Sequence, residues 1–234
     1  MTKNRTGEKV YSHLYQSIIG SLLYLKVSRP NINFVVNVCA RYQADPRTSH
    51  LHSAKRILKY ISGTFNYGLW YIFDTTEVLV GYCDADWARC SDDQKSTSEG
   101  CFFLGNNIAA WFNKKQNSVS LSTAEAEYIA AESSCLQLLW MKQMLEEYGI
   151  HQSSMVLYCD NMSVISISKN PVQHSRTKHI DIRHHFIREL VNTKIISLEH
   201  VRSSLQLADI FTKPLDVSTF EGLRTDVGVC QRTT

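Results

Sequence analysis

The stretch VGYCDADWA, residues 80–88, begins as a buried strand and ends with two carboxylates, Asp84 and Asp86. Strands alternate inward and outward side chains and are poor in Asp, so this pair indicates either a solvated turn or a cation site. A second apolar stretch, LYCDN (157–161), finishes in the same Tyr-Cys-Asp order, with Asp160 as the acid. If the two strands are parallel neighbours, both acids lie at one edge of the sheet, where open α/β sheets place their sites.

The composition is that of an ordinary globular protein: 234 residues, 44% hydrophobic and 20% charged, with a net charge of only +3. The seven Cys are scattered without a Cys-x-x-Cys pair, which disfavours a disulfide framework or a structural zinc site and favours a reducing compartment. The N-terminus lacks a signal-peptide pattern, and the most apolar run (18–27) is too short to span a bilayer. We therefore expect an intracellular protein, cytoplasmic or nuclear, that binds no membrane.

The pattern of apolar residues changes near residue 74. Helical periodicity dominates before that point, and short apolar runs separated by turn residues follow it. The order after residue 74 reads as three strands, a long helix, a strand, two helices, a strand and a helix (78–83, 98–105, 107–113, 122–148, 154–160, 161–170, 175–193, 194–202 and 205–213). Hairpins combined with parallel crossovers predict an α/β fold, with a mixed sheet flanked by helices and preceded by a small, mainly helical segment.

Four acids fall at the ends of these elements: Asp84, Glu127, Asp160 and Asp209. Carboxylates gathered at one point repel each other unless a cation neutralises them. Oxygen ligands suit Mg²⁺ or Mn²⁺, and a pair of such ions is the arrangement that hydrolyses phosphodiesters. The pattern therefore predicts a two-metal nuclease. The alternative is four unrelated surface acids.

Longer motifs carry a family resemblance. The segments GYCDADWA, KSTSEGCFFLG, SLSTAEAEYIAA, LYCDN, SRTKHIDIRHHFIREL and LADIFTKPL occur in that order. Together they closely resemble the ribonuclease H domain that ends the polyprotein of copia-type LTR retrotransposons, over about residues 78–215. Residues 15–42 and 52–69 are similar to the segment that follows the reverse-transcriptase palm. The resemblance implies a reverse-transcriptase remnant at 1–74, a ribonuclease H-like domain with a five-stranded mixed sheet at 75–217, and a C-terminal tail at 218–234.

The resemblance implies an endonuclease that cuts the RNA strand of an RNA–DNA hybrid with two Mg²⁺ or Mn²⁺ ions and no small-molecule cofactor. The catalytic and metal-binding roles carry over onto Asp84, Glu127, Asp160 and Asp209. Residues two apart on a helix point about 200° apart, so Glu125 and Glu127 cannot both face the site, and the family register selects Glu127. Asp84 and Asp86 share a strand face. The family's strand-end acid matches Asp84, which leaves Asp86 a supporting role.

Two further features have weaker family parallels. His200 resembles the mobile histidine that assists product release or proton transfer in ribonucleases H, although a strand His is more often packed or solvated. A basic segment sits where some relatives carry a basic helix, and such a helix can follow the phosphates of a hybrid or simply be solvated. Its candidate nucleic-acid contacts are Arg176, Lys178, Arg183 and Arg188, with His179, His184 and His185 beside them.

Other features limit the expected activity. No Tyr-x-Asp-Asp motif precedes residue 74, so no polymerase activity is expected. The Gly that copia elements usually carry after DADWA is Arg89 here, and the usual KSTSGY reads KSTSEG, which introduces Glu99. A catalytically silent fragment that binds nucleic acid or protein is therefore the alternative function. An integrase-like protein is disfavoured because Glu127 falls between Asp84 and Asp160.

Overall fold

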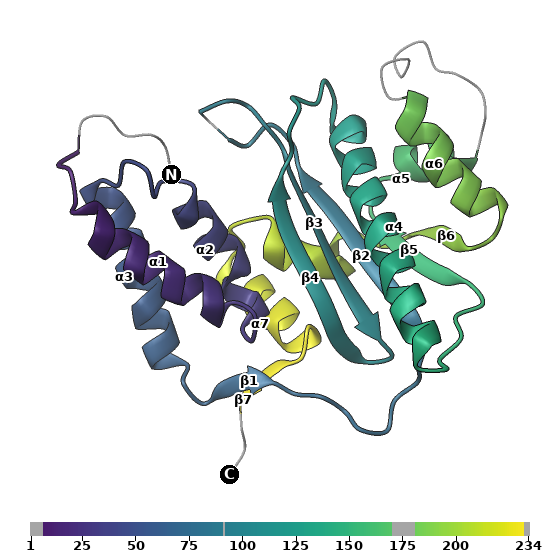
Figure 1. Cartoon of the computed structure of the whole chain (residues 1–234), viewed down its shortest axis with the longest axis horizontal. Coiled ribbons are helices and arrows are strands. Elements are labelled where there is room, and N and C mark those ends of the chain that lie inside the picture. Colours follow the sequence, from purple (N-terminus) through teal and green to yellow (C-terminus); the bar gives the residue numbers. More distant parts are fainter. Residues whose placement is uncertain (1–6, 91, 170–180, 232–234) are drawn as a thin grey trace. The chain divides into compact units, whose positions relative to one another are not determined.

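A computed structural model describes residues 7–90, 92–169 and 181–231. The contacts divide the chain into two compact units, which are described separately (Figure 1). The first unit comprises Met1–Trp70 and Lys213–Thr234, and the second comprises Tyr71–Thr212. The expected assignment of 1–74 to a reverse-transcriptase remnant rests on the family resemblance and stays a prediction.

The first unit is mainly helical, as predicted for the segment that precedes the sheet. Its elements are α1 (Ser12–Leu25), η1 (Pro30–Ile32), α2 (Asn33–Ala40), α3 (Thr48–Gly63), β1 (Tyr67–Leu69), α7 (Val217–Asp226) and β7 (Val229–Gln231). Side chains of α1, α2 and α3, among them Tyr15, Val36 and Ala54, form its core. Residues 218–234, expected as a tail, contribute α7 and the strand β7, which pairs antiparallel with β1.

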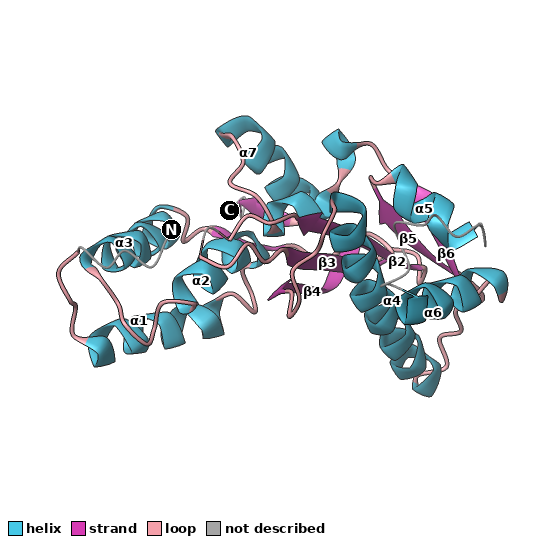
Figure 2. Ribbon diagram, turned by 90° about the horizontal axis from the view of Figure 1, so that it is seen from above, coloured by secondary structure: helices cyan, strands magenta, loops and turns pink. Residues whose placement is uncertain are grey.

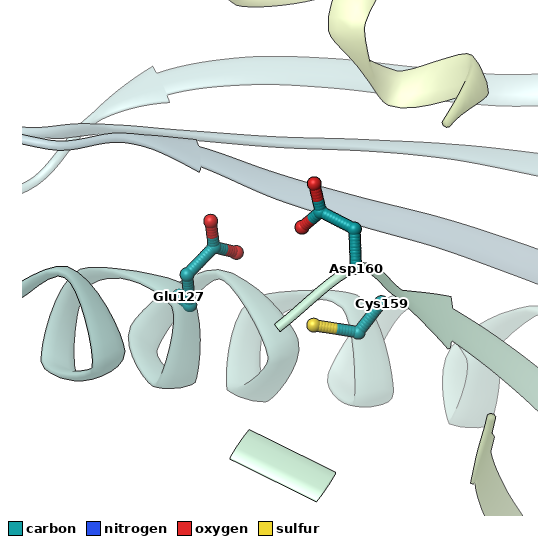
Figure 3. A group of neighbouring side chains, drawn as sticks. All are labelled: Glu127, Cys159 and Asp160. Carbon is teal, nitrogen blue, oxygen red and sulfur yellow. The ribbon is translucent and has the colours of Figure 1, made fainter. Parts of the chain in front are cut away.

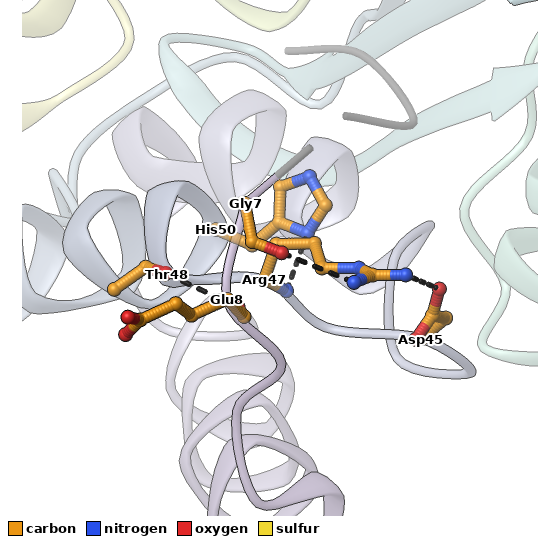
Figure 4. Close-up of polar contacts among 6 residues, drawn as sticks. All are labelled: Gly7, Glu8, Asp45, Arg47, Thr48 and His50. Carbon is orange, nitrogen blue, oxygen red and sulfur yellow. Dashed lines mark hydrogen bonds and ion pairs between the residues drawn. The ribbon is translucent and has the colours of Figure 1, made fainter. Parts of the chain in front are cut away.

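Arg47 fastens the start of α3 to the chain that precedes α1 (Figure 4). Its guanidinium donates to the carbonyl of Gly7 at 3.1 Å and pairs with Asp45 at 2.6 Å. Its backbone N–H donates to Nδ1 of His50, and Thr48 Oγ1 donates to the carbonyl of Glu8. The His50 bond satisfies a backbone N–H at a helix start that lacks an Asp, Ser or Asn cap, and the bonds to Gly7 and Glu8 hold the preceding chain against it.

The second unit contains a five-stranded sheet in the order β4-β3-β2-β5-β6 (Figure 1). The strands β2 (Leu79–Asp86), β3 (Thr97–Leu104) and β4 (Asn107–Lys115) form an antiparallel meander. The strands β5 (Met155–Cys159) and β6 (Ile196–His200) extend it in parallel on the other side of β2. The helical elements are α4 (Thr123–Glu147), α5 (Met162–Lys169), α6 (Asp181–Asn192), η3 (Ser203–Leu205) and η4 (Leu207–Phe211). The predicted mixed five-stranded sheet flanked by helices is confirmed.

The main core lies between the sheet and α4, α5 and α6. It includes Leu79, Phe102, Tyr128, Leu157 and Ile187, all at most 1% exposed. The helices α4 and α6 lie side by side (Figure 2). Among the described helices, none has the length and apolarity needed to cross a bilayer.

A tight turn joins β3 and β4. Leu104 pairs with Asn107, so the connection has two residues, and the first of them, Gly105, has a φ of 59°. That position suits a type II′ turn, in which Gly comes first. A β-carbon on Gly105 would also clash with the backbone carbonyl of Thr76. The turn thereby sets the first two pairs of the hairpin, and a register shift between Phe102 and Phe103 sets the pairs beyond it.

Candidate metal centre

The strands that carry the two Tyr-Cys-Asp sequences are parallel neighbours. Tyr82 of β2 is in register with Tyr158 of β5, and their ring centroids are 4.9 Å apart. Two residues further along, the two strands reach Asp84 and Asp160. Because the strands are parallel neighbours, Asp84 and Asp160 come to the same edge of the sheet, as the sequence pattern allowed.

The acidic first turns of α4 are ordered by its N-terminal cap. Ser122 accepts a hydrogen bond from the backbone N–H of Glu125 at 3.2 Å. The Glu125 carboxylate in turn accepts from the backbone N–H of Leu121 at 2.6 Å. Glu125 is thus engaged in capping the helix. Glu127, which is 7% exposed, projects from a different side of α4.

Three potential metal ligands converge where α4 meets the end of β5. A carboxylate oxygen of Glu127, the Sγ of Cys159 and a carboxylate oxygen of Asp160 all lie within 4.8 Å of one another (Figure 3). Glu127 and Cys159 are buried and Asp160 is partly exposed. Among the described residues, these three side chains form the one group with three potential ligand atoms this close together. Asp84 and Asp209 are not part of it. Cys159 was not among the ligands expected from the sequence.

Asp84 has a second carboxylate directly opposite it. Asp84 pairs with Glu99 in the antiparallel ladder of β2 and β3, and Glu99 pairs with Asn113 of β4. Directly paired residues project to the same face, and Asp84 and Glu99 are 1% and 0% exposed. The Asn113 side-chain amide donates to Glu99 Oε1 at 2.7 Å and to the carbonyl of Phe211 at 2.5 Å. The sequence indicated Glu99 as a departure from the family close to Asp84, without pairing the two residues.

Asp209 lies on a short element that is fastened to the strand carrying Asp84. It belongs to η4 and is 9% exposed. Gln206, at the start of η4, is fully buried and donates from Nε2 to the carbonyl of Cys83 at 2.9 Å. Its Oε1 accepts from the backbone N–H of Ala208. One glutamine therefore bonds to the residue before Asp84 and to the residue before Asp209.

Asp86 and His200 are the other two residues that the sequence associated with this site. Asp86 forms an ion pair with Arg89, with 3.4 Å between Oδ2 and Nε. His200 is exposed at the end of β6 and is in register with Cys159, the residue before Asp160. Asp160 also accepts a hydrogen bond from Ser203 at 3.0 Å.

The basic segment is described only in part. Arg176, Lys178 and His179 lie outside the described residues. Arg183, His184 and His185 fall in α6, where their side chains are not described. Arg188 is partly buried, and its positive charge acts against the burial that raises the pKa of Tyr128 on α4. Arg188 therefore faces α4 at least in part.

The donor set fits a divalent cation. Carboxylates from α4 and from the end of β5 meet at a partly exposed edge, and the buried Asp84 and Asp209 come from a neighbouring strand and a short helix. Carboxylate oxygens with room for water are the ligands that Mg²⁺ and Mn²⁺ accept. The chemical class of site predicted from the sequence is compatible with these side chains.

Comparison with known proteins gives strong sequence relatives. The chain is 40% identical over 216 residues to the retrovirus-related Pol polyprotein from transposon RE1 of Arabidopsis thaliana, which covers 92% of this chain. It is 39% identical over 216 residues to the corresponding polyprotein from transposon TNT 1-94 of Nicotiana tabacum, again covering 92% of this chain. The chain spans only 15% and 16% of the length of these relatives. No protein-family model matches the chain.

Solved structures show a weaker similarity. An RNase H1 isolated from compost by a metagenomic approach is 13% identical and has a TM-score of 0.45. The alignment covers 58% of this chain and 93% of that one. The N-terminal RNase H domain of Rv2228c from Mycobacterium tuberculosis is 10% identical, with a TM-score of 0.43, covering 64% and 98%.

Proposed function

The chain belongs to the retrovirus-related Pol polyproteins of copia-type transposons, and we propose that its second unit hydrolyses the RNA strand of RNA–DNA hybrids. The observation that carries the proposal is the convergence of Glu127 and Asp160 at the edge where β2 and β5 end. A phosphodiester hydrolase needs acids from separate elements at one point. The family resemblance supplies the substrate, because it names the ribonuclease H domain.

In this proposal Asp84, Glu127, Asp160 and Asp209 hold two Mg²⁺ or Mn²⁺ ions. When bound, such ions activate water and stabilise the leaving oxygen of a phosphodiester. The protein side chains hold the acids in place. Gln206 fixes the chain beside Asp84 and Asp209, and the capped first turn of α4 orients Glu127. Because the acids come from four elements, their spacing depends on the intact second unit.

We assign recognition of the hybrid to shape rather than sequence. A-form duplexes are recognised through phosphates and 2′-hydroxyls. Arg176, Lys178, Arg183 and Arg188 are the proposed phosphate contacts, and His200, exposed near Asp160, is the proposed residue for proton transfer or product release. The sequence has no Tyr-x-Asp-Asp motif before residue 74, so we do not propose DNA polymerisation.

The test is cleavage of a labelled RNA–DNA hybrid by the full chain in Mg²⁺, beside double-stranded DNA and double-stranded RNA of the same sequence. We expect cleavage of the RNA strand of the hybrid alone. Asp84→Asn and Asp160→Asn should each lower the rate at least about 100-fold, since each removes a direct ligand. Asp86→Asn is the matched control on the same strand, because Asp86 is paired with Arg89.

No cleavage by folded wild-type protein that binds Mg²⁺ would contradict the enzymatic proposal. The alternative is then a silent fragment that binds nucleic acid or protein. A gel-shift measurement with the same three duplexes would show whether nucleic-acid binding survives without hydrolysis.

A further inference from the structure

One ligand in the candidate metal centre does not suit magnesium. The Sγ of Cys159 lies within 4.8 Å of carboxylate oxygens of both Glu127 and Asp160. In Figure 3 the thiol points toward α4, and the two carboxylates lie on the same side of it. Thiolate is a soft ligand that Mg²⁺ and Mn²⁺ do not prefer, whereas Zn²⁺ and Cd²⁺ do. The centre therefore combines hard and soft donors.

A second buried thiol, Cys83, lies beside Cys159. Cys83 of β2 and Cys159 of β5 are both 0% exposed. The two thiols are close enough to interact with each other. Cys83 also donates weakly to the carbonyl of Tyr158, at 3.6 Å. The soft donor at the centre is therefore one of two adjacent buried thiols, contributed by the two strands that carry Asp84 and Asp160.

We propose that Glu127, Cys159 and Asp160 bind a thiophilic divalent cation of the Zn²⁺ or Cd²⁺ class, in competition with Mg²⁺. Two carboxylate oxygens and one sulfur, with a water molecule, complete the four-coordinate arrangement that Zn²⁺ favours. Binding exchanges the thiol proton for the metal: the S–H bond breaks, a sulfur–metal bond forms, the proton goes to solvent, and no atom changes oxidation state.

The inhibitory consequence rests on the proposed function, whereas the binding site rests only on the three side chains. Zn²⁺ exceeds Mn²⁺ in affinity for most protein sites, and a sulfur ligand widens that difference. A thiophilic ion bound to Glu127 and Asp160 occupies two of the acids that hydrolysis requires. Zn²⁺ at concentrations far below that of Mg²⁺ should therefore inhibit cleavage of the hybrid.

Binding is measured with Cd²⁺, because the sulfur-to-cadmium charge-transfer band in the ultraviolet reports a thiolate ligand directly. All proteins carry Cys90→Ser and Cys230→Ser, which removes the two partly exposed thiols from the background. We expect the band to saturate at one equivalent of Cd²⁺ in this background protein. Zn²⁺ should abolish the band at low excess, and Mg²⁺ only at high excess.

The comparison is between Cys159→Ser and Cys101→Ser in that background. Cys101 is equally buried, at 0% exposed, but lies on β3 outside the group of three ligands. Cys159→Ser should remove the band and weaken Zn²⁺ binding at least about tenfold, a loss that removal of even an indirect metal partner produces. Cys101→Ser should retain both. If Cys159→Ser fails to fold, Cys159→Ala replaces it.

Absence of the band in the folded background protein overturns the inference, as does a band that survives in folded Cys159→Ser. The proposed nuclease function is tested by a separate result. A protein that shows the band but cleaves no hybrid retains the thiophilic site and loses the nuclease. A protein that cleaves the hybrid in Mg²⁺ and shows no band retains the nuclease and loses the thiophilic site.

Discussion

Asp84 and Glu99 stand directly opposite each other in the antiparallel ladder of β2 and β3, and both side chains are buried. Like charges in directly paired positions destabilise a sheet, and burial increases their repulsion. A divalent cation held by Asp84, as proposed above, would relieve that repulsion. Glu99 thus places a second carboxylate beside the strand-end acid.

Glu99→Gln removes this charge and retains the oxygen that accepts from Asn113. We expect the variant, without divalent cations, to gain about 1 kcal/mol in the free energy of unfolding, because the paired like charges are gone. The additional stabilisation by Mg²⁺ should become smaller. Thermal unfolding with EDTA and with Mg²⁺ measures both effects. Asp86→Asn is the control, and a Glu99→Gln variant with an unchanged Mg²⁺ increment would refute the expectation.

Gln206 and Gln152 hold opposite ends of β2. Gln206 donates to the carbonyl of Cys83, whereas Gln152 accepts from the N–H of Leu79 and donates to the carbonyl of Glu77. Each Gln→Met substitution should cost about 1–3 kcal/mol of unfolding free energy, because buried backbone groups lose their partners. Gln206→Met alone should also slow hybrid cleavage at a temperature where both variants are folded. Equal cleavage rates would show that Gln206 does not position the acids.

Cys39 makes the stability of the first unit depend on alkaline pH. Burial raises the pKa of this thiol from 9.0 to about 11. Because the folded state favours the neutral thiol, the contribution is complete below pH 9 and declines as the pH rises through 11. The loss should reach about 2 kcal/mol by pH 11. Urea unfolding of wild type and Cys39→Ala between pH 8 and 11 measures it. The variant should have the shallower decline, and parallel curves would exclude Cys39 as the source.

The order of elements in the second unit was predictable because its signals are local. The helix expected at 122–148 is α4, Thr123–Glu147, and its N-terminal cap is Ser122. The strands that carry the Tyr-Cys-Asp sequences are parallel neighbours, which was the condition for bringing their acids to one edge of the sheet. The segment expected as a last helix forms the short helices η3 and η4 instead. Asp209 still lies in a helical element, η4.

What the sequence did not reveal depends on contacts between distant residues. Glu99 is paired with Asp84 because of the register between β2 and β3. That register cannot be read from the presence of a glutamate at position 99. In the sequence, Cys159 looks like the other cysteines in apolar segments. What distinguishes it is its short distance from Glu127, which lies on another element. The pairing of β1 with β7 joins two three-residue strands that lie far apart in the sequence and are too short to show a period-two pattern.

The most direct test compares Glu127→Gln with Glu125→Gln in cleavage of an RNA–DNA hybrid by the full chain in Mg²⁺. The two glutamates are two residues apart on α4 and almost equally buried, at 7% and 8% exposed. Glu125 caps the helix, whereas Glu127 faces Cys159 and Asp160. We predict that Glu127→Gln abolishes cleavage and that folded Glu125→Gln retains it. Cleavage by Glu127→Gln at the wild-type rate would contradict the account.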